Sequence, residues 1–227
     1  MFKNIYGWLD NNKKRYKSEL EYRKIVDNII WIIAGRFVRL GLGVIVASLV
    51  ARHLGPLDYG RIVYVIAFVG LFSAFASFGL NGVVVRELVK STENYGNILG
   101  ASVVIQLIAG MISIVIITSG FFYSNDFSDQ NLLFVGATIL LFRVSDVIKY
   151  WYESQVLTKN VVMVETVSYF LVAIISIILI INNSHVIMFV LVTSVEGLIV
   201  LLLLFYMYSR SGYRISNWKV RYGEIKY

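Results

Sequence analysis

An apolar run of membrane length near the N-terminus, residues 29–51, constrains the fold of this chain more than any other feature. At about 1.5 Å per residue, a helix of this length crosses a hydrocarbon core of about 30 Å. Arg36 and Arg39 lie well inside the run. An arginine at the centre of a membrane helix costs about 2.5 to 3.5 kcal/mol, so we expect both to face a partner. Because they are three residues apart, they project from one side of the helix.

The composition excludes an ordinary water-soluble domain. Hydrophobic residues make up 58% of the 227 residues and charged residues only 15%, whereas soluble domains have about half and about a quarter. Without cysteine, disulfides and thiolate metal sites are excluded, and the histidines are His53 and His185. The net charge of +7 would favour nucleic acid in a soluble chain. In a membrane chain the placement of the basic residues reports topology instead, so we expect neither a nucleic-acid partner nor a cofactor.

The hydropathy pattern predicts an all-α integral membrane protein, with six transmembrane helices in one lobe spanning residues 28–208. A basic segment, residues 1–27, precedes the lobe, and a tail, residues 209–227, follows it. We expect helices near 28–51, 62–85, 98–122, 131–150, 160–181 and 185–208. The fourth contains Arg143, Asp146 and Lys149, so it needs protein or water beside it. The single proline, Pro56, falls in the predicted first outer loop, so no helix is expected to carry a proline kink.

The distribution of lysine and arginine predicts the orientation. Most of the 21 basic residues fall in the N-terminal segment, in the second and fourth connections and in the C-terminal tail. Lys149 and Lys159 belong to this group, whereas Arg52 and Arg61 fall on the other side. The positive-inside rule therefore places both termini in the cytoplasm of a multi-pass protein of the cell membrane.

Charged residues inside the predicted helices balance one another. Arg36, Arg39 and Arg143 are offset by Asp146, Glu165 and Glu196. One interpretation is therefore that these groups pair and hold the bundle together. Arg143 and Asp146 have the spacing of a local helical pair, and Glu165 lies about one helical turn inside the cytoplasmic boundary, where it could reach water.

Glu196 and the two arginines of the first helix allow a functional interpretation as well. Glu196 lies near the middle of its helix, so it either meets an arginine of another helix or is protonated, and it could then carry a proton in a coupled transporter. Asp146 and Glu165 are further candidates for proton or ion coupling. Arg36 and Arg39 have no acid on their own helix, and their planar guanidinium groups match phosphate oxygens. A phosphate-bearing cargo and structural pairing both remain open for them.

A stretch after the first helix resembles the polysaccharide transporter branch of the multidrug/oligosaccharidyl-lipid/polysaccharide exporter superfamily, which contains the O-antigen-type flippases. The matching features are Ala51-Arg52, Leu54-Gly55-Pro56, Tyr59-Gly60, Phe78-Gly79-Leu80, Gly82 and Arg86-Glu87. The resemblance implies a flippase for a polyprenyl-pyrophosphate-linked oligosaccharide in polysaccharide biosynthesis. It also implies a central cationic cavity lined by Arg36, Arg39 and Arg143. Arg52, Gly55, Pro56 and Gly60 then form a structural motif in which Arg52 braces the outer end of the first helix.

Members of this family have 12 to 14 helices in two lobes, so the resemblance implies that this chain corresponds to the N-terminal lobe. Residues 209–227 would then lead toward a second lobe, and a homodimer of such lobes is an alternative. Besides this cargo, we expect the surrounding membrane lipids as partners.

Other functions remain open at this point. One is an exporter of the same superfamily that carries a lipid-linked peptidoglycan precursor or a drug, and another is a non-transporting membrane scaffold subunit. A membrane glycosyltransferase or polymerase needs a base or metal ligands, and the outer loops contain only His53, Asp58, Asp126, Asp129 and His185, without metal-ligand spacing. We therefore predict a protein that is not an enzyme and has no metal site.

Overall fold

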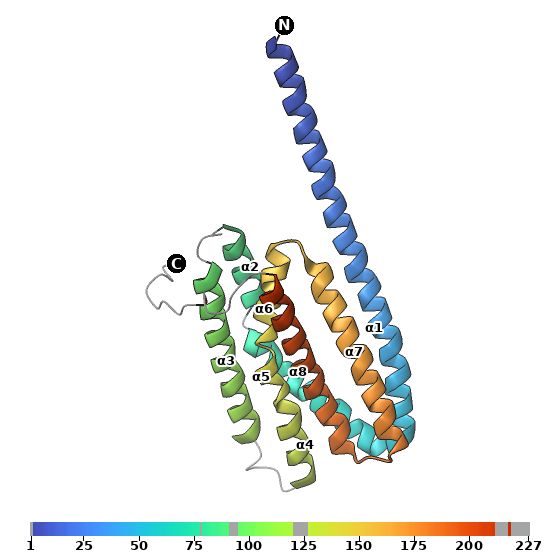
Figure 1. The fold of residues 1–227 in the computed structure, drawn as a ribbon. Coiled ribbons are helices and arrows are strands. Elements are labelled where there is room, and N and C mark those ends of the chain that lie inside the picture. The colour runs from blue at the N-terminus through green and yellow to red at the C-terminus, as the bar shows by residue number, and fades with distance from the viewer. Residues whose placement is uncertain (1, 78, 91–94, 120–126, 212–217, 219–227) are drawn as a thin grey trace.

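The computed structural model is a bundle of helices from which the N-terminal part of the first helix extends (Figure 1). It describes residues 2–77, 79–90, 95–119, 127–211 and 218. The helices are α1 (Phe2–Ser77), α2 (Leu80–Lys90), α3 (Tyr95–Ser119), α4 (Phe127–Ala137), α5 (Ile139–Phe142), α6 (Ser145–Ser154), α7 (Thr158–Ile181) and α8 (Val186–Arg210).

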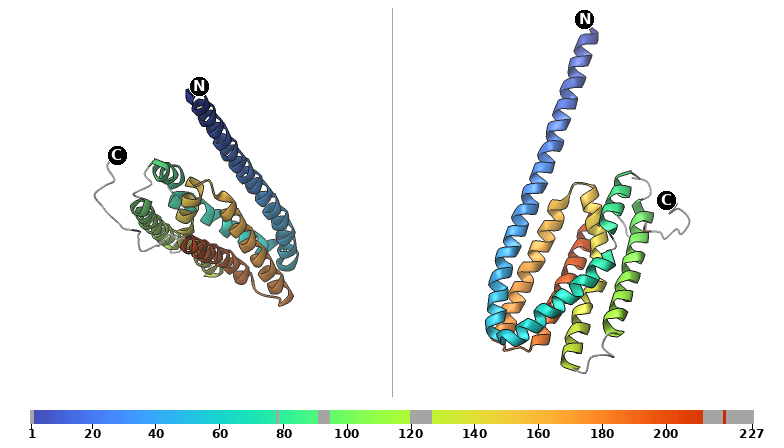
Figure 2. Two further views of the ribbon diagram at one scale, coloured as in Figure 1. Left: turned by 45° about the horizontal axis from the view of Figure 1, so that its top comes forward. Right: turned by 180° about the vertical axis from the view of Figure 1, so that it is seen from behind.

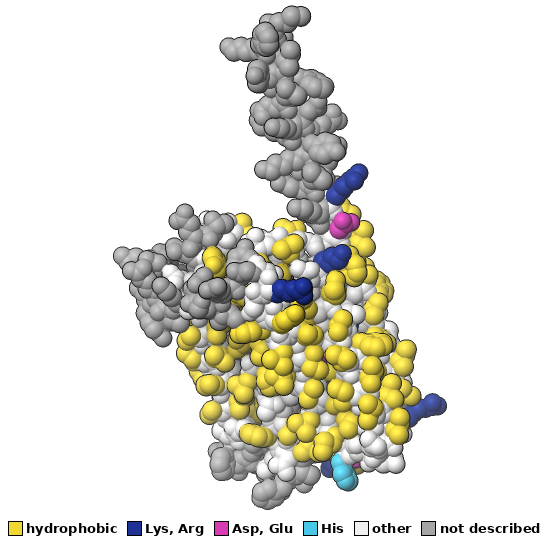
Figure 3. Space-filling model, in the orientation of Figure 1, with side chains coloured by type: hydrophobic (Ala, Val, Ile, Leu, Met, Phe, Trp, Pro, Cys, Tyr) yellow, Lys and Arg dark blue, Asp and Glu magenta, His cyan; other side chains and the backbone are white. Residues whose placement is uncertain are grey.

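Five stretches are long and apolar enough to cross a membrane: 26–74, 95–119, 130–154, 158–181 and 186–210. The first is 49 residues long, more than twice the roughly 20 that one crossing needs. It bends sharply at Gly55, and its second half runs back across the bundle toward α2 (Figure 2). Hydrophobic side chains cover the face between the two ends of the bundle in Figure 3. The predicted all-α bundle with membrane-length helices is confirmed, and these helices indicate a multi-pass membrane protein.

The bend in α1 lies at Gly55, where φ is 77° and ψ is 173°. Only glycine adopts this conformation without steric cost, because it lacks a Cβ atom. Pro56 then begins the second half of the helix, where its missing N–H breaks no hydrogen bond. The predicted loop with Pro56 in it is therefore wrong: the chain reverses between two helical halves, residues 2–54 and 56–77, within one residue.

The second and fourth predicted helices have different limits in the structure. The second begins at Pro56 rather than 62, and Gly79, with a φ of 65°, separates it from α2. The fourth, predicted as one helix over 131–150, is one apolar span, 130–154, within which tight turns at Thr138 and at Arg143 and Val144 separate α4, α5 and α6. At the first break the Thr138 hydroxyl donates to the Val135 carbonyl (2.6 Å) and lies 2.7 Å from the Ser194 hydroxyl of α8. A partner on another helix thus stabilises a break that the hydropathy pattern does not mark.

Two apolar clusters fill the bundle toward its two ends. The end with the N-terminal extension contains Leu99, Trp151, Tyr152, Leu204 and Tyr208. The opposite end, near the bend of α1, contains a second set: Val50, Ile62, Val65, Ile117, Leu132, Ala137, Phe189 and Val190.

The first half of α1 and α7 lie side by side and run in the same direction (Figure 1). Their contact depends on glycine. A Cβ atom at Gly35 would lie 2.2 Å from a methyl carbon of Val162, and one at Gly43 would lie 3.0 Å from the Tyr169 hydroxyl. The absence of side chains at these positions lets the two helices approach closely.

Candidate functional site

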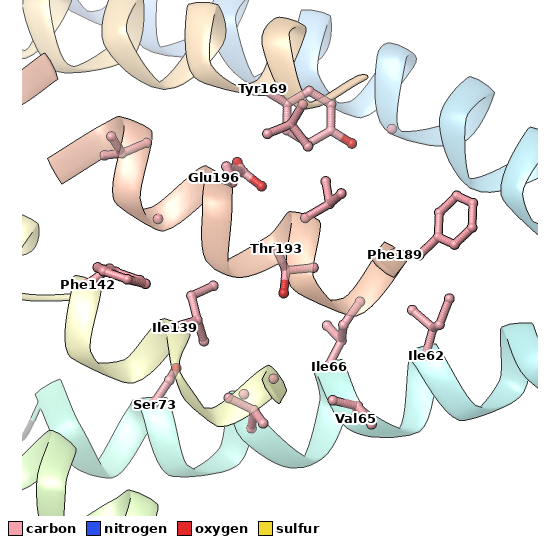
Figure 4. A pocket seen from close by; sticks show the side chains of 18 of the residues that line it. Ile62, Val65, Ile66, Ser73, Ile139, Phe142, Tyr169, Phe189, Thr193 and Glu196 are labelled. Carbon is pink, nitrogen blue, oxygen red and sulfur yellow. The ribbon is translucent and has the colours of Figure 1, made fainter. Parts of the chain in front are cut away.

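A cavity of about 580 Å³ lies inside the bundle, between both halves of α1, α4 to α6, α7 and α8. Its walls are apolar over much of their area. Figure 4 shows Ile62, Val65 and Ile66 on the second half of α1, across the cavity from Phe189 on α8. Charged side chains also line it: Arg39, Arg143, Asp146, Lys149, Glu165 and Glu196. The cavity therefore combines apolar walls with a charged region.

Five of the charged side chains form one continuous network. Arg39 Nη1 lies 2.6 Å from Glu165 Oε2, and the other carboxylate oxygen of Glu165 lies 2.8 Å from Lys149 Nζ. Lys149 Nζ is also 3.0 Å from Asp146 Oδ1. The second oxygen of Asp146 accepts from Arg143 Nε at 3.0 Å. Glu165 and Asp146 thus each bridge two cations.

Arg143 also donates to the Ser73 hydroxyl on the second half of α1. The network therefore connects both halves of α1 with α6 and α7. The pair of Arg143 and Asp146, predicted from their spacing, is present. The pair of Arg39 and Glu165 joins residues 126 positions apart in the chain. Arg36, the other arginine of the first helix, does not take part in it.

Lys149 belongs to the network, although the sequence predicted no site role for it. The distribution of basic residues assigned it to the cytoplasmic side, yet its ammonium group is bound by Asp146 and Glu165. The signal that could have revealed it is its position three residues after Asp146 on the same helix, which favours an ion pair.

Glu196 lies on α8 and lines the same cavity. Among the residues that the structure describes, no hydrogen bond or ion pair involves its carboxylate. Figure 4 shows Tyr169 of α7 on the facing side. Counting Glu196, the cavity contains three cationic and three acidic side chains, so its formal charge is balanced.

Arg36 differs from Arg39 in its surroundings. Its side chain is exposed and does not line the cavity, and within the described part of the chain it has no ion pair. It lies seven residues before Gly43 and eleven before Ala47, both of which line the cavity. At 100° per residue these three positions share one stripe of the helix. Arg36 therefore continues the lining stripe beyond the cavity, as a cation that no carboxylate of the described residues neutralises.

The motif residues Arg52, Gly55, Pro56 and Gly60 lie at the bend of α1, and none of them lines the cavity. Next to them, Asp58 and Arg61 pair across one turn at 3.1 Å. No group of three or more His, Cys, Asp or Glu side chains that could hold a metal ion occurs within the described ranges.

This arrangement suits an amphipathic ligand. Apolar walls accommodate hydrocarbon or the faces of sugar rings, and the paired charges offer both donors and acceptors for hydroxyl groups. Each cation inside the cavity is already bound to a carboxylate. An anion must therefore displace a carboxylate, or bind Arg36, whose guanidinium group has no ion pair among the described residues.

Comparison with known proteins gives one finding. A family model described as "Polysaccharide biosynthesis protein" matches residues 25–222. No curated protein and no solved structure matches the chain.

Proposed function

Because the chain belongs to the polysaccharide biosynthesis protein family, we propose that it is a transporter that flips a polyprenyl-pyrophosphate-linked oligosaccharide across the cytoplasmic membrane. In this proposal both termini are cytoplasmic and no covalent bond of the cargo changes. The observation that carries it is the cavity with apolar walls and a charged region inside a membrane-length bundle.

The chemistry of the cavity fits this cargo class. Sugar hydroxyls and phosphate oxygens cannot cross hydrocarbon without polar partners. The volume of about 580 Å³ lies within the range of about 300 to 1,000 Å³ of ligand pockets, so it accommodates part of a head group. The polyprenyl chain then stays in the bilayer.

Arg36 is the proposed first contact for the pyrophosphate. Its guanidinium group is exposed, has no acidic partner among the described residues and lies on the stripe that leads to Gly43 and Ala47. Arg39 and Arg143 contact the cargo deeper in the cavity when phosphate oxygens replace the carboxylates that now bind them.

The carboxylates of the cavity supply a proposed coupling device. A proton on Glu165 would weaken its bonds to both Arg39 and Lys149 and leave these cations free for an anion. Asp146 has the same relation to Arg143 and Lys149. Glu196, whose carboxylate makes no hydrogen bond or ion pair in the described part of the chain, is the proposed proton carrier.

A second helical lobe, either a further part of the transporter or a second copy of this chain, is proposed to cover the open side of the cavity. Val63 and Ile66 line the cavity, yet 48% and 51% of their surface is exposed. A cargo with several hydroxyl groups needs this side closed while it crosses the membrane.

The test is the initial rate of flipping by the native assembly in proteoliposomes, with a fluorescent polyprenyl-pyrophosphate oligosaccharide as cargo. Arg36→Gln removes a charge-assisted contact worth about 1.5 to 3 kcal/mol, so we expect the rate to fall at least about tenfold. Arg86→Gln, an exposed arginine on α2 away from the cavity, is the matched control and leaves the rate unchanged.

An unchanged rate for Arg36→Gln, at equal amounts of folded protein, would contradict the assignment of Arg36. No flipping by the native assembly would overturn the transport function itself. Mass spectrometry of the recovered cargo distinguishes transport, which leaves the mass unchanged, from glycosyl transfer.

A further inference from the structure

The seam between α1 and α7 has a polar contact at the end where α1 leaves the bundle. Asn28 is 8% exposed there. Its carboxamide donates to the Val156 carbonyl in the link between α6 and α7, and its oxygen accepts from the backbone N–H of Lys159 at 3.2 Å. One side chain of α1 thus satisfies one donor and one acceptor of another part of the chain.

The two backbone groups that Asn28 binds need partners. Lys159 lies in the first turn of α7, where N–H groups have no partner within the helix. The residue before that helix, Leu157, makes no side-chain capping bond. Asn28 therefore caps α7 from a different helix.

Val156 reinforces the importance of this contact. Its φ is 56°, a conformation that is rare for a β-branched residue and costs about 1 to 3 kcal/mol. The bond from Asn28 to its carbonyl helps to hold this link in place. One turn further along α1, Lys159 Nζ lies 4.6 Å from the centre of the Trp31 ring, a cation–π contact across the same seam.

The seam is also a wall of the cavity, since Arg39 and Gly43 of α1 and Glu165 and Tyr169 of α7 all line it. At the far end, α1 bends at Gly55, and nothing lies within 4 Å of the position of a Cβ atom there. Single residues of this kind absorb backbone rotation in hinges. The first half of α1 is therefore held to α7 at Asn28, where the seam begins, and by the Arg39–Glu165 pair further along, and it has a hinge-like residue at its other end.

We propose that Asn28 is a latch: it holds the first half of α1 against α7, and its release opens this wall of the cavity sideways to the bilayer. The inference rests on the proposed function only for what enters through the opening. A sideways opening admits a head group while the lipid chain of the cargo remains in the membrane. The latch itself is a property of the protein without cargo.

The absence of cysteine from the chain allows a direct test. Ile33 on α1 and Met163 on α7, both exposed, are replaced by cysteines that carry spin labels. Pulsed electron–electron double resonance in bilayer nanodiscs then gives the distance between the two labels. Asn28→Ala removes both hydrogen bonds, and Asn28→Asp keeps the acceptor for Lys159 but loses the donor for Val156.

We expect Asn28→Ala to raise the ratio of separated to closed pairs about 25-fold and Asn28→Asp to raise it less, since each of the two bonds contributes about a factor of five. Asn160→Ala is the control, because this asparagine in the first turn of α7 makes no side-chain hydrogen bond among the described residues. It leaves the distance distribution unchanged.

A distance distribution in Asn28→Ala equal to that of the native protein would overturn the latch. If thermal unfolding shows that Asn28→Ala does not fold, Asn28→Asp takes its place: a distance distribution equal to that of the native protein would then overturn the latch. Separation without any flipping of the oligosaccharide would leave the latch standing and overturn the proposed cargo. Flipping of the oligosaccharide without separation of the two labels would overturn the latch and leave the proposed cargo standing.

Discussion

Replacing Glu165 with glutamine tests whether the ion network holds the bundle together. The carboxylate of Glu165 lies between Arg39 Nη1 at 2.6 Å and Lys149 Nζ at 2.8 Å, so it connects α1 and α6 through α7. Glutamine keeps the size of the side chain but has no charge, and only one of its polar atoms accepts hydrogen bonds. At least one of the two cations therefore loses its acceptor.

The expected cost follows from the burial of the three side chains. Arg39 is 28% exposed, Lys149 22% and Glu165 20%. Breaking a fully buried ion pair by removing one partner costs about 3 to 5 kcal/mol, whereas exposed pairs contribute about 0.2 to 1 kcal/mol. For these mostly buried groups we expect a loss of about 2 to 3 kcal/mol. At about 2 to 4 °C per kcal/mol for a chain of this size, the midpoint of unfolding falls by roughly 4 to 12 °C.

Thermal unfolding of the full chain in detergent micelles measures this shift. Glu87→Gln is the matched control, because Glu87 and Lys90 form a pair whose side chains are 46% and 52% exposed. It changes the midpoint by no more than about 2 °C. Arg39→Gln combined with Glu165→Gln lowers the free energy of unfolding by less than the sum of the two single changes. In each single change the other member of the pair stays charged without its partner, whereas in the double change both members are neutral.

Equal midpoints for Glu165→Gln and Glu87→Gln would refute the reasoning that burial makes this network stabilising. Strict additivity of Arg39→Gln and Glu165→Gln would show that the contact seen at 2.6 Å carries no coupling energy. In either case the charges of the cavity would have to be explained by the cargo alone.

Two further predictions concern glycines. Gly136→Ala brings a Cβ atom to 2.4 Å from a methyl carbon of Val65, so we expect the free energy of unfolding to fall by about 1 to 3 kcal/mol. Gly41→Ala is its control, because nothing lies within 4 Å of a Cβ atom there. We expect this change to stabilise the helix by up to about 1 kcal/mol. Gly55→Ala meets no atom within 4 Å but must adopt a φ of 77°, which costs about 1 to 3 kcal/mol. Chemical unfolding in mixed micelles measures all three, and equal effects of Gly136→Ala and Gly41→Ala would show that the contact with Val65 is not tight.

The membrane-length helices could be predicted because hydropathy is a local property of the sequence. Their breaks were harder to predict. Gly55 and Pro56 suggested a loop, but glycine alone provides the positive φ that joins two helices directly. The break at Thr138 has no proline or glycine at the position, and it is stabilised by Ser194, 56 residues further on. Contacts between helices, which leave no local pattern, decided it.

The candidate site was predicted in part for the same reason. Arg143 and Asp146 are neighbours on a helix, so their spacing predicts their contact. The partner of Arg39 depends on how α1 and α7 are rotated and aligned, which is set by the close approach at Gly35 and Gly43. The same alignment brings Lys149 to Glu165. Arg36 and Arg39 looked equivalent in sequence, and only the packing separates them.

By itself, the sequence determined a membrane bundle of apolar helices, a balance of charges inside them and the local pair on the fourth pass. The tertiary structure decided which cations meet which carboxylates, that Arg36 stays without an acidic partner in the described part of the chain, and that Asn28 caps α7. The physical reason is that helices apolar on nearly every face carry no stripe that specifies which side meets protein. Small residues and a few polar contacts set that choice, and they act only once the helices are packed together.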